Sequence, residues 1–453
     1  MTIQANPVDT SRGLVSTEIF TDPETYEREQ ERLFRRTWLY VAHESQIPKA
    51  GDYITNFMGE QEVIVIRGTD AKVRVLKNKC AHRGNKVCLF DRGNAKAFSC
   101  TFHGWRYNDQ GALVGVPFLK EGYHGDVEFP TWGLEAAPRV AEYGGFIFAS
   151  WDDGIVGLDE YLGELRWYLD RLLVLGFLGG VEVVGGRQRY TMPTNWKLLA
   201  ENFQGDDYHV QITHASYLRV LAEENGGLRG KVDLNDRLQV AAGYPSGIAH
   251  GLGALKVAAT AKDISRELFI AETIGPEAVE WVKERARRVE EFQKDDKVKV
   301  HLCSNINVFP AFSVVCGPNA LFGTGILQWH PRGPMATDVW QWAIVEKDAP
   351  DSVKRVAIRE LIGAQAAAGM LAPDDSENFE RSKDNLHARW SGERPFHYAM
   401  AVANDRDEGL RARLAGEGVD VDDLPGLIGP YVWEVNQRQF YRYWEELMSD
   451  PGR

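Results

Sequence analysis

The stretch that decides the fold contains two short clusters, Cys80-Ala81-His82-Arg83-Gly84 and Cys100-Thr101-Phe102-His103-Gly104-Trp105-Arg106-Tyr107. Each cluster supplies one cysteine and one histidine, the first as a Cys-x-His pair and the second as a Cys-x2-His pair. Thiolates and imidazoles are the side chains that bind zinc and iron–sulfur centres in proteins. The sequence therefore predicts a metal centre held by Cys80, His82, Cys100 and His103.

Two kinds of metal centre use two cysteines and two histidines. A Rieske [2Fe–2S] cluster takes cysteines on one iron and histidines on the other, whereas a structural zinc site places all four ligands on one ion. Zinc fingers pair cysteine with cysteine and histidine with histidine. Here each pair is mixed and each is followed by a glycine turn between strand-like flanks. These features favour the cluster, with zinc as the alternative.

The same stretch resembles the Rieske domain of the large (alpha) subunit of the aromatic-ring-hydroxylating dioxygenases. Respiratory Rieske proteins carry two further cysteines in these loops, and neither loop has one at the matching place. The resemblance implies that Cys80 and Cys100 bind one iron and His82 and His103 bind the other. Without that disulfide, we expect a reduction potential toward the lower end of the Rieske range.

Composition narrows the class of protein. The chain has 453 residues, enough for two or three domains, and its net charge of −13 argues against nucleic acid and anionic membranes as partners. No apolar run is long enough to span a bilayer, and the first twelve residues do not resemble a signal peptide. We therefore expect a cytoplasmic protein.

The three further cysteines, an odd number, indicate reduced thiols: Cys88, Cys303 and Cys316.

The pattern along the chain predicts an α+β protein with a small antiparallel β domain inserted near the N-terminus. Residues 17–40 have the cap Asp22-Pro23 and an apolar stripe typical of a helix. Short β-branched and aromatic runs then predict a small antiparallel β domain over residues 38–157, which the resemblance identifies as the Rieske domain. The resemblance implies that residues 158–453, together with the N-terminal helix region 1–37, form the larger catalytic domain, in which helices back an antiparallel sheet.

A second chemical stretch runs from Asn195 to His214 and contains His209. On an ideal helix two residues five positions apart point about 140° away from each other, so the two histidines could not share a metal. They converge only where the helix is widened to a π-type turn or broken. The residues alone leave three possibilities for the two histidines: surface, core or metal binding.

The run Glu201-Asn202-Phe203-x-Gly205-Asp206-x-Tyr208-His209-x4-His214 resembles the ferrous-iron motif of the same dioxygenases. The resemblance implies that His209 and His214 bind Fe(II) with a distant carboxylate, leaving positions open for oxygen and substrate. It places that carboxylate at Asp375, with Asp374 as the alternative. Read alone, the stretch from Pro373 to Asn378 indicates the cap of a helix.

Asp206 precedes His209 by three residues and therefore shares its face on a helix. It could be a ligand, a hydrogen-bond partner of the imidazole, or a solvent-facing acid. The resemblance implies that Asp206 is a catalytic residue that bridges His209 to His103 of a neighbouring subunit.

The resemblance also places residues toward the substrate. They are Asn202, Phe203, Val210 and Asn305, although packing alone would explain Phe203 and Val210. The motif residues there are neutral, which favours an aromatic hydrocarbon over an aromatic carboxylate. The glycine-rich stretch 215–260 reads as irregular loops that could cover the pocket.

The activity implied by the resemblance is that of a terminal oxygenase. It uses O2 to convert an arene to a cis-dihydrodiol, with electrons from NADH. The chain has no Gly-x-Gly-x-x-Gly nucleotide turn, so a separate reductase and a ferredoxin are expected to deliver them. A small beta subunit in an α3β3 assembly is also implied. The alternatives are a Rieske monooxygenase or demethylase, a dioxygenase of aromatic carboxylates, and an electron-transfer Rieske protein.

Overall fold

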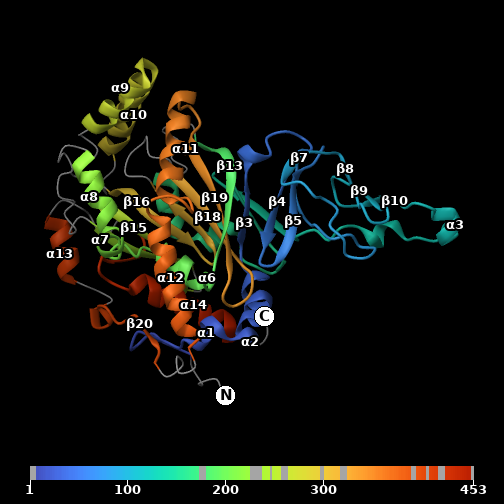
Figure 1. Cartoon of the computed structure of the whole chain (residues 1–453), viewed down its shortest axis with the longest axis horizontal. Helices are drawn as coiled ribbons and strands as arrows, with labels where there is room; N and C mark the ends of the chain where they lie inside the picture. The colour runs from blue at the N-terminus through green and yellow to red at the C-terminus, as the bar shows by residue number, and fades with distance from the viewer. Residues whose placement is uncertain are drawn as a thin grey trace. The chain divides into compact units, whose positions relative to one another are not determined.

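The computed structural model describes residues 7–172, 180–224, 237–244, 247–256, 264–295, 300–316, 324–388, 394–404, 408–416 and 424–449. The chain divides into two compact units, Gln30–Leu158 on the one hand and Met1–Glu29 with Asp159–Arg453 on the other (Figure 1). No helix of the described ranges is long and apolar enough to cross a membrane.

The unit Gln30–Leu158 is built from antiparallel strands in three small sheets, ordered β6-β5-β4-β7, β10-β9-β8 and β11-β12-β3. The β-branched runs predicted strands because such side chains pack well on a pleated surface. The strands are β3 Leu39–His43, β4 Asp52–Met58, β5 Gln61–Arg67, β6 Val73–Lys77, β7 Arg92–Asn94, β8 Ala97–Ser99, β9 Arg106–Asn108, β10 Leu113–Gly115, β11 Arg139–Tyr143 and β12 Phe146–Ser150. Short helical turns are η1 Gln30–Phe34, η2 Glu44–Gln46, α3 Leu119–Tyr123 and η3 Phe129–Trp132.

The larger unit is organised around one eight-stranded antiparallel sheet, ordered β13-β19-β18-β17-β16-β15-β14-β21. Its strands are β13 Val181–Met192, β14 Arg237–Tyr244, β15 Gly247–Lys256, β16 Val300–Val308, β17 Phe312–Val315, β18 Thr324–Pro331, β19 Thr337–Glu346 and β21 Leu427–Pro430. A three-stranded sheet joins β1 Val8–Asp9, β2 Leu14–Val15 and β20 Phe396–His397.

Helices pack against this sheet: α14 on β14 and β15, α6 on β18, and α11 on β18 and β19. The helices are α1 Glu18–Thr21, α2 Pro23–Glu29, α4 Leu158–Leu162, α5 Leu165–Leu172, α6 Trp196–Asn202, α7 Val210–Thr213, α8 Ala215–Glu224, α9 Ser265–Ile274, α10 Pro276–Asp295, α11 Asp351–Gln365, α12 Ala372–Leu386, η6 Val402–Asn404, α13 Glu408–Gly416 and α14 Val435–Ser449. The predicted α+β fold, with a small antiparallel β domain and a helix-backed antiparallel sheet, is confirmed.

Two expectations about local structure are wrong. Residues 17–40 are not one helix, because α1, α2 and the π-helical turn η1 follow one another and β3 begins at Leu39. Asp22 does cap α2, since its Oδ2 accepts a hydrogen bond from the Thr25 N–H at 2.9 Å.

Residues 215–260 are not irregular, because α8, β14 and β15 lie in this stretch. At Gly251 of β15 a Cβ would lie 2.7 Å from the Gln204 side chain, so one of these glycines serves close packing. Gly226 and Gly227 of that stretch lie outside the described residues.

A buried ion pair joins the N-terminal segment to α6. The Lys197 ammonium lies 2.6 Å from Glu29, and both side chains are fully buried. The indoles of Trp196 and Trp444 donate hydrogen bonds to the same carboxylate at 2.9 and 2.7 Å. Burial lowers the pKa of Lys197, and the Glu29 carboxylate opposes that shift. Three donors thus satisfy one buried carboxylate, which is the condition under which a buried charge is tolerated.

Replacing Lys197 by methionine should cost about 3–5 kcal/mol of unfolding free energy, because the Glu29 carboxylate would stay buried without its cation. Urea-induced unfolding, followed by tryptophan fluorescence, measures this loss. The double variant Glu29→Gln/Lys197→Met removes both charges and should recover most of it. A loss below about 1 kcal/mol for Lys197→Met would show that the pair is not ionised.

Candidate metal centres

The two cluster loops of the smaller unit have the same backbone construction. The N–H of Cys80 bonds the carbonyl of Asn85, and the N–H of Cys100 bonds the carbonyl of Trp105, both at 2.8 Å. In each loop the glycine four residues after the cysteine donates back to the cysteine carbonyl. Gly84 and Gly104 have φ of +75° and +72°, which favours glycine at both positions. The sequence repeat Cys…His…Gly is therefore a structural repeat.

These loops bring like ligands together. The rings of His82 and His103 lie 4.6 Å apart, and His82 stacks on Trp105 at 4.9 Å. Burial alone would raise the pKa of the Cys100 thiol, but hydrogen bonds from the Phe102 backbone, the Asn85 side chain and other neighbours lower it below its usual range. The thiolate, which is the form that binds metal, is therefore favoured.

Two side chains reach the sulfur atoms. The Tyr107 hydroxyl lies 3.2 Å from Cys80 Sγ and also accepts a hydrogen bond from the Ala81 N–H. The Asn85 amide lies 3.6 Å from Cys100 Sγ. Hydrogen bonds to ligand sulfurs are one of the means by which a protein sets the potential of an iron–sulfur cluster.

The pairing of the four side chains favours the two-iron cluster over zinc. The imidazole rings of His82 and His103 lie together, with centroids 4.6 Å apart, and the Cys80 and Cys100 thiols are close enough to hydrogen-bond. A Rieske cluster places two cysteines on one iron and two histidines on the other, so one pair of like ligands is available for each iron.

In the larger unit the helix carrying the second motif is broken. Helix α6 ends at Asn202, and α7 begins at Val210, so His209 and His214 flank the single turn of α7. Gly205 between the helices has φ of +102°, and a Cβ there would lie 2.7 Å from both Asn436 Nδ2 and the Leu252 carbonyl. The break brings the two imidazole rings to 5.4 Å, edge to face.

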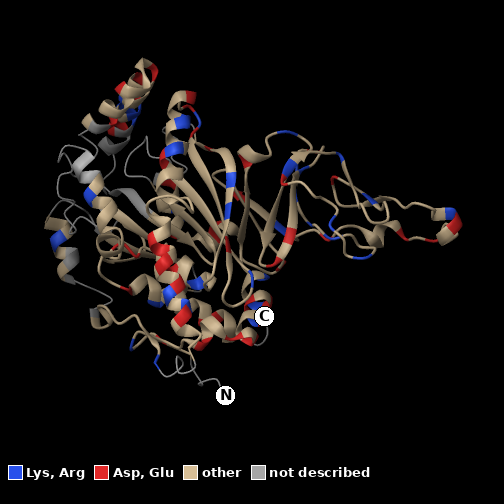
Figure 2. Cartoon of the chain, in the orientation of Figure 1, with Lys and Arg blue, Asp and Glu red and all other residues tan. Residues whose placement is uncertain are grey.

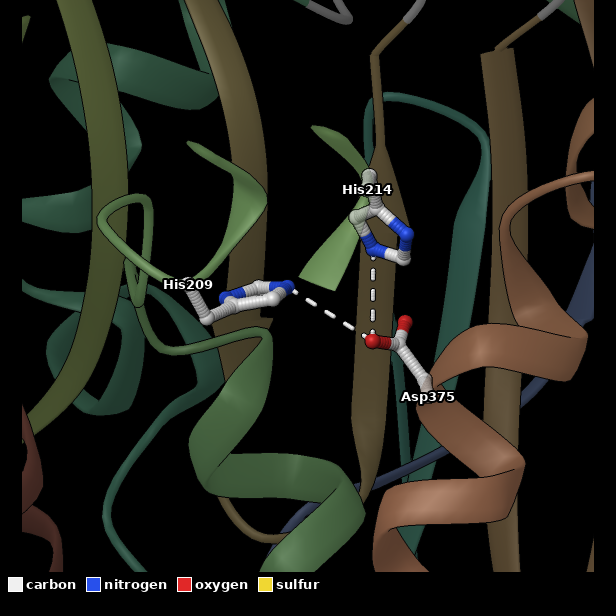
Figure 3. Close-up of side chains that lie close together, drawn as sticks. All are labelled: His209, His214 and Asp375. Atoms are coloured by element: carbon white, nitrogen blue, oxygen red, sulfur yellow. Dashed lines mark ion pairs between the residues drawn. The ribbon is translucent and has the colours of Figure 1, made fainter. Parts of the chain in front are cut away.

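Asp375, in the first turn of α12, completes this group (Figure 3). Its Oδ1 lies 3.2 Å from His214 Nε2 and 3.7 Å from His209 Nε2. One ligand atom from each of the three residues lies within 4.8 Å of the other two. The expected helix is present, but the cap predicted between Pro373 and Asn378 is wrong, because α12 begins at Ala372 and its N-cap is Leu371. Helix α12 carries many acidic residues along its length (Figure 2). Two imidazoles and one carboxylate are the donor set of non-haem iron, so the group fits Fe(II).

A second carboxylate lies on the far side of each imidazole. Asp206 Oδ1 lies 3.3 Å from His209 Nδ1, and Asp374 Oδ2 lies 3.2 Å from His214 Nδ1. Burial would lower the pKa of His209, but Asp206 and then Asp375 raise it to about 9, so the site favours positive charge. A carboxylate at Nδ1 leaves Nε2 free to bind a metal. Asp374 was expected only as an alternative iron ligand, and its position beside His214 Nδ1 was not predicted. The pair of adjacent aspartates in the sequence was the feature that pointed to it.

The four residues expected near substrate have ordinary packing contacts. The Phe203 ring lies 5.1 Å from that of Trp329. Asn305 is buried on β16, where its Oδ1 accepts a hydrogen bond from the Gly253 N–H. Asn202 ends α6 and Val210 begins α7, and both are half-buried.

A cavity of about 310 Å³ lies on the Asp206 side of this site and contains none of those four residues. It is lined by Glu201, Asp206, Tyr208, Phe396, His397, Tyr398, Glu434 and Gln437. Several of these side chains come from segments far along the chain, and the sequence did not indicate that they meet Asp206. Tyr208, which does lie in the motif, places its hydroxyl 3.3 Å from Glu434.

Comparison with known proteins finds a known domain in each of the two units. Residues 37–138 match the Rieske [2Fe–2S] domain, and residues 160–450 match the ring-hydroxylating alpha subunit catalytic domain. The chain is 35% identical to the alpha subunit of biphenyl 2,3-dioxygenase of Rhodococcus jostii (strain RHA1), over 99% of this chain and 91% of that one. It is 34% identical to the alpha subunit of benzene 1,2-dioxygenase of Pseudomonas putida, over 98% and 93%.

A solved structure has the same fold. Naphthalene 1,2-dioxygenase from Rhodococcus sp., bound to indole, superposes with a TM-score of 0.77 at 30% identity, covering 97% of this chain and 95% of that one. Both domains and nearly the full length of these relatives are therefore represented. The chain belongs to the ring-hydroxylating dioxygenases, as an alpha subunit with a Rieske [2Fe–2S] domain and a catalytic domain that binds mononuclear Fe(II).

Proposed function

We propose that this alpha subunit dihydroxylates a neutral aromatic hydrocarbon, with Fe(II) held by His209, His214 and Asp375. The observation that carries the proposal is the convergence of two Nε2 atoms and one carboxylate oxygen on a single point (Figure 3). Cys80, Cys100, His82 and His103 hold the cluster in the unit Gln30–Leu158. We assign residues 38–157 to the Rieske domain and residues 158–453, with segment 1–37, to the catalytic domain.

The metals supply the electron transfer and the activation of O2 when they are bound. The protein residues prepare the site for them. Asp206 and Asp374 hold the Nδ1 sides of His209 and His214, which orients both rings. Asp375, with only 17% of its side chain exposed, supplies the negative charge that a divalent ion needs in a partly buried place.

We place Asp206 in the path of the electrons. Its carboxylate lies against His209 and lines the cavity described above, and the family resemblance pairs it with His103 of a second copy of the chain. An α3β3 assembly with a small beta subunit would bring those copies together. A ferredoxin and an NADH-dependent reductase would reduce the cluster, and the complex would be cytoplasmic.

The substrate class follows from two observations. The motif residues Asn202, Phe203 and Val210 carry no charge, so an aromatic carboxylate would lack a cationic partner among them. The relatives above are named for biphenyl, benzene and naphthalene. An uncharged arene of one or two rings therefore suits this chain best.

The test is product analysis with purified alpha subunit, its partner subunit and an NADH-fed reductase and ferredoxin. Benzene, naphthalene, biphenyl and benzoate are supplied separately under 18O2. A cis-dihydrodiol with two labelled oxygen atoms is expected. A single labelled oxygen would indicate a monooxygenase, product from benzoate alone would indicate a carboxylate substrate, and a protein that carries electrons without consuming oxygen would be an electron-transfer protein.

Asp375→Ala should remove the mononuclear iron, because two imidazoles would remain without their carboxylate. Analysis of iron and acid-labile sulfide should show the iron content falling from three to two irons per two sulfides, with the cluster absorbance retained. The matched variant Asp374→Ala should keep the iron with about 10–100-fold weaker affinity, since this residue only orients His214. Iron lost from Asp374→Ala and retained in Asp375→Ala would exchange the two roles.

Tyr107→Phe should lower the reduction potential of the cluster while preserving the packing of the ring. A hydrogen bond is worth about 0.5–1.5 kcal/mol, which for one electron is about 20–60 mV, given that about 59 mV corresponds to tenfold. Voltammetry of the holoprotein measures the potential directly. Tyr123→Phe, a nearby ring 6.4 Å from Trp105, is the control and should leave the potential unchanged. Equal potentials for Tyr107→Phe and wild type would exclude the hydroxyl–sulfur bond.

A further inference from the structure

Glu201, in the last turn of α6, is a carboxyl group that the proposed chemistry does not use. Its Oε1 accepts a hydrogen bond from the Tyr398 hydroxyl at 2.8 Å. Its Oε2 is buried and has no hydrogen-bond partner of ordinary geometry, and the Tyr441 hydroxyl also lies close to the carboxyl group. The side chain also lines the cavity that contains Asp206. A buried carboxyl with an unsatisfied oxygen requires an explanation.

The groups around Glu201 offer it little positive charge. Lys197 lies close enough for its charge to act on Glu201, but its ammonium already pairs with Glu29 at 2.6 Å. Arg438 donates to the backbone carbonyls of Tyr398 and Met400. The other titratable groups that face Glu201 or line its cavity are acids, phenols and one imidazole: Asp206, Tyr208, His397, Tyr398, Glu434 and Tyr441.

These surroundings favour the protonated form of Glu201. Burial, then the charges of Asp206 and Glu434, raise its pKa to about 8, against the opposing effect of the Tyr441 and Tyr398 hydroxyls. At pH 7 the side chain is therefore mainly a neutral carboxylic acid, which carries a donor as well as an acceptor. The pKa values of Tyr208, Tyr398 and Tyr441 are raised as well, so these phenols keep their protons up to strongly alkaline pH.

We propose that Glu201 is a positioning residue: its buried side chain, held by the Tyr398 hydroxyl and lining the same cavity as Asp206, keeps the Asp206 carboxylate in place against His209. The inference rests on the proposed role of Asp206 in the electron path. Ionised Glu201 would add a negative charge to a cavity already lined by Asp206 and Glu434. The Asp206 carboxylate lies only 3.3 Å from His209 Nδ1, so repulsion from an ionised Glu201 would move it away from the imidazole.

The step that depends on this arrangement is the transfer of one electron from the reduced cluster to the mononuclear iron. Glu201 neither gains nor loses its proton in that step, and no bond forms or breaks at its carboxyl. Loss of the proton to solvent at alkaline pH interrupts the transfer, and its return restores it.

The experiment is a single-turnover measurement on the assembled holoenzyme between pH 6 and pH 9.5. The cluster is reduced, the enzyme is mixed with O2 and the arene that gives product, and the reoxidation of the cluster is followed by its absorbance. The wild-type rate should fall about tenfold between pH 7 and pH 9, as expected for one group that titrates near pH 8. Glu201→Gln, which is neutral at every pH, should stay within about threefold of the wild-type rate at pH 7 and lose the alkaline fall.

Glu434→Gln is the matched control, because it removes another carboxyl of the same cavity. It should retain the alkaline fall. Infrared spectra supply a readout that does not depend on turnover. The difference spectrum of wild type minus Glu201→Gln should contain the C=O stretch of one protonated carboxylic acid at pH 7 and lose it toward pH 9.

Three outcomes would overturn the inference. They are an alkaline fall that persists in Glu201→Gln, a fall that disappears in Glu434→Gln instead, and a wild-type spectrum whose carboxylic acid band is unchanged by Glu201→Gln. Asp206→Asn separates this failure from failure of the electron path. If Asp206→Asn leaves the rate unchanged, the path through Asp206 is wrong. If it slows the rate at least tenfold while Glu201→Gln behaves as the wild type, the path stands and Glu201 has no part in it.

Discussion

The break in the polypeptide between α6 and α7 is the constraint on which the iron site depends. In a continuous helix His209 and His214 would point in directions about 140° apart. The chain leaves the helix after Asn202, passes through Gly205 in a left-handed conformation, and re-enters a single helical turn that the two histidines flank. Packing from distant elements maintains this break, since the Asn436 side chain of α14 bonds the Gln204 carbonyl and β15 lies against Gly205.

Carboxylates around the two histidines have separate tasks because they approach different atoms. Asp375 faces both Nε2 atoms, while Asp206 and Asp374 each face one Nδ1. A carboxylate is therefore placed to bind the metal at one position and orients an imidazole ring at the other two. Glu201 lies farther away, buried and hydrogen-bonded to a phenol, where it is retained as a neutral acid. Burial and neighbouring charge, more than residue type, separate the roles of these carboxyl groups.

The cluster domain reaches its site in a simpler way. Two loops of the same construction bring two sulfurs and two imidazoles together, and a glycine closes each loop. Histidine lies beside histidine and cysteine beside cysteine, an arrangement that suits a two-iron cluster and that the ligand types alone could not show. Tyr107, two residues after Trp105 in the same motif, then comes to lie beside Cys80.

Much of this protein could be predicted from local sequence, because both metal motifs are short and contain most of their own ligands. Cys80, His82, Cys100 and His103 lie within 24 residues, and the strands and helices around them follow from side-chain pattern. The α+β class and both cofactors follow from the same motifs. What the sequence left open needed contacts between distant residues. The choice between Asp374 and Asp375, the helix break, and the meeting of Glu201 with Tyr398 depend on segments about 160 to 240 residues apart. Sequence spacing carries no information on such contacts, since long-range packing of the sheet and helices decides which side chains meet.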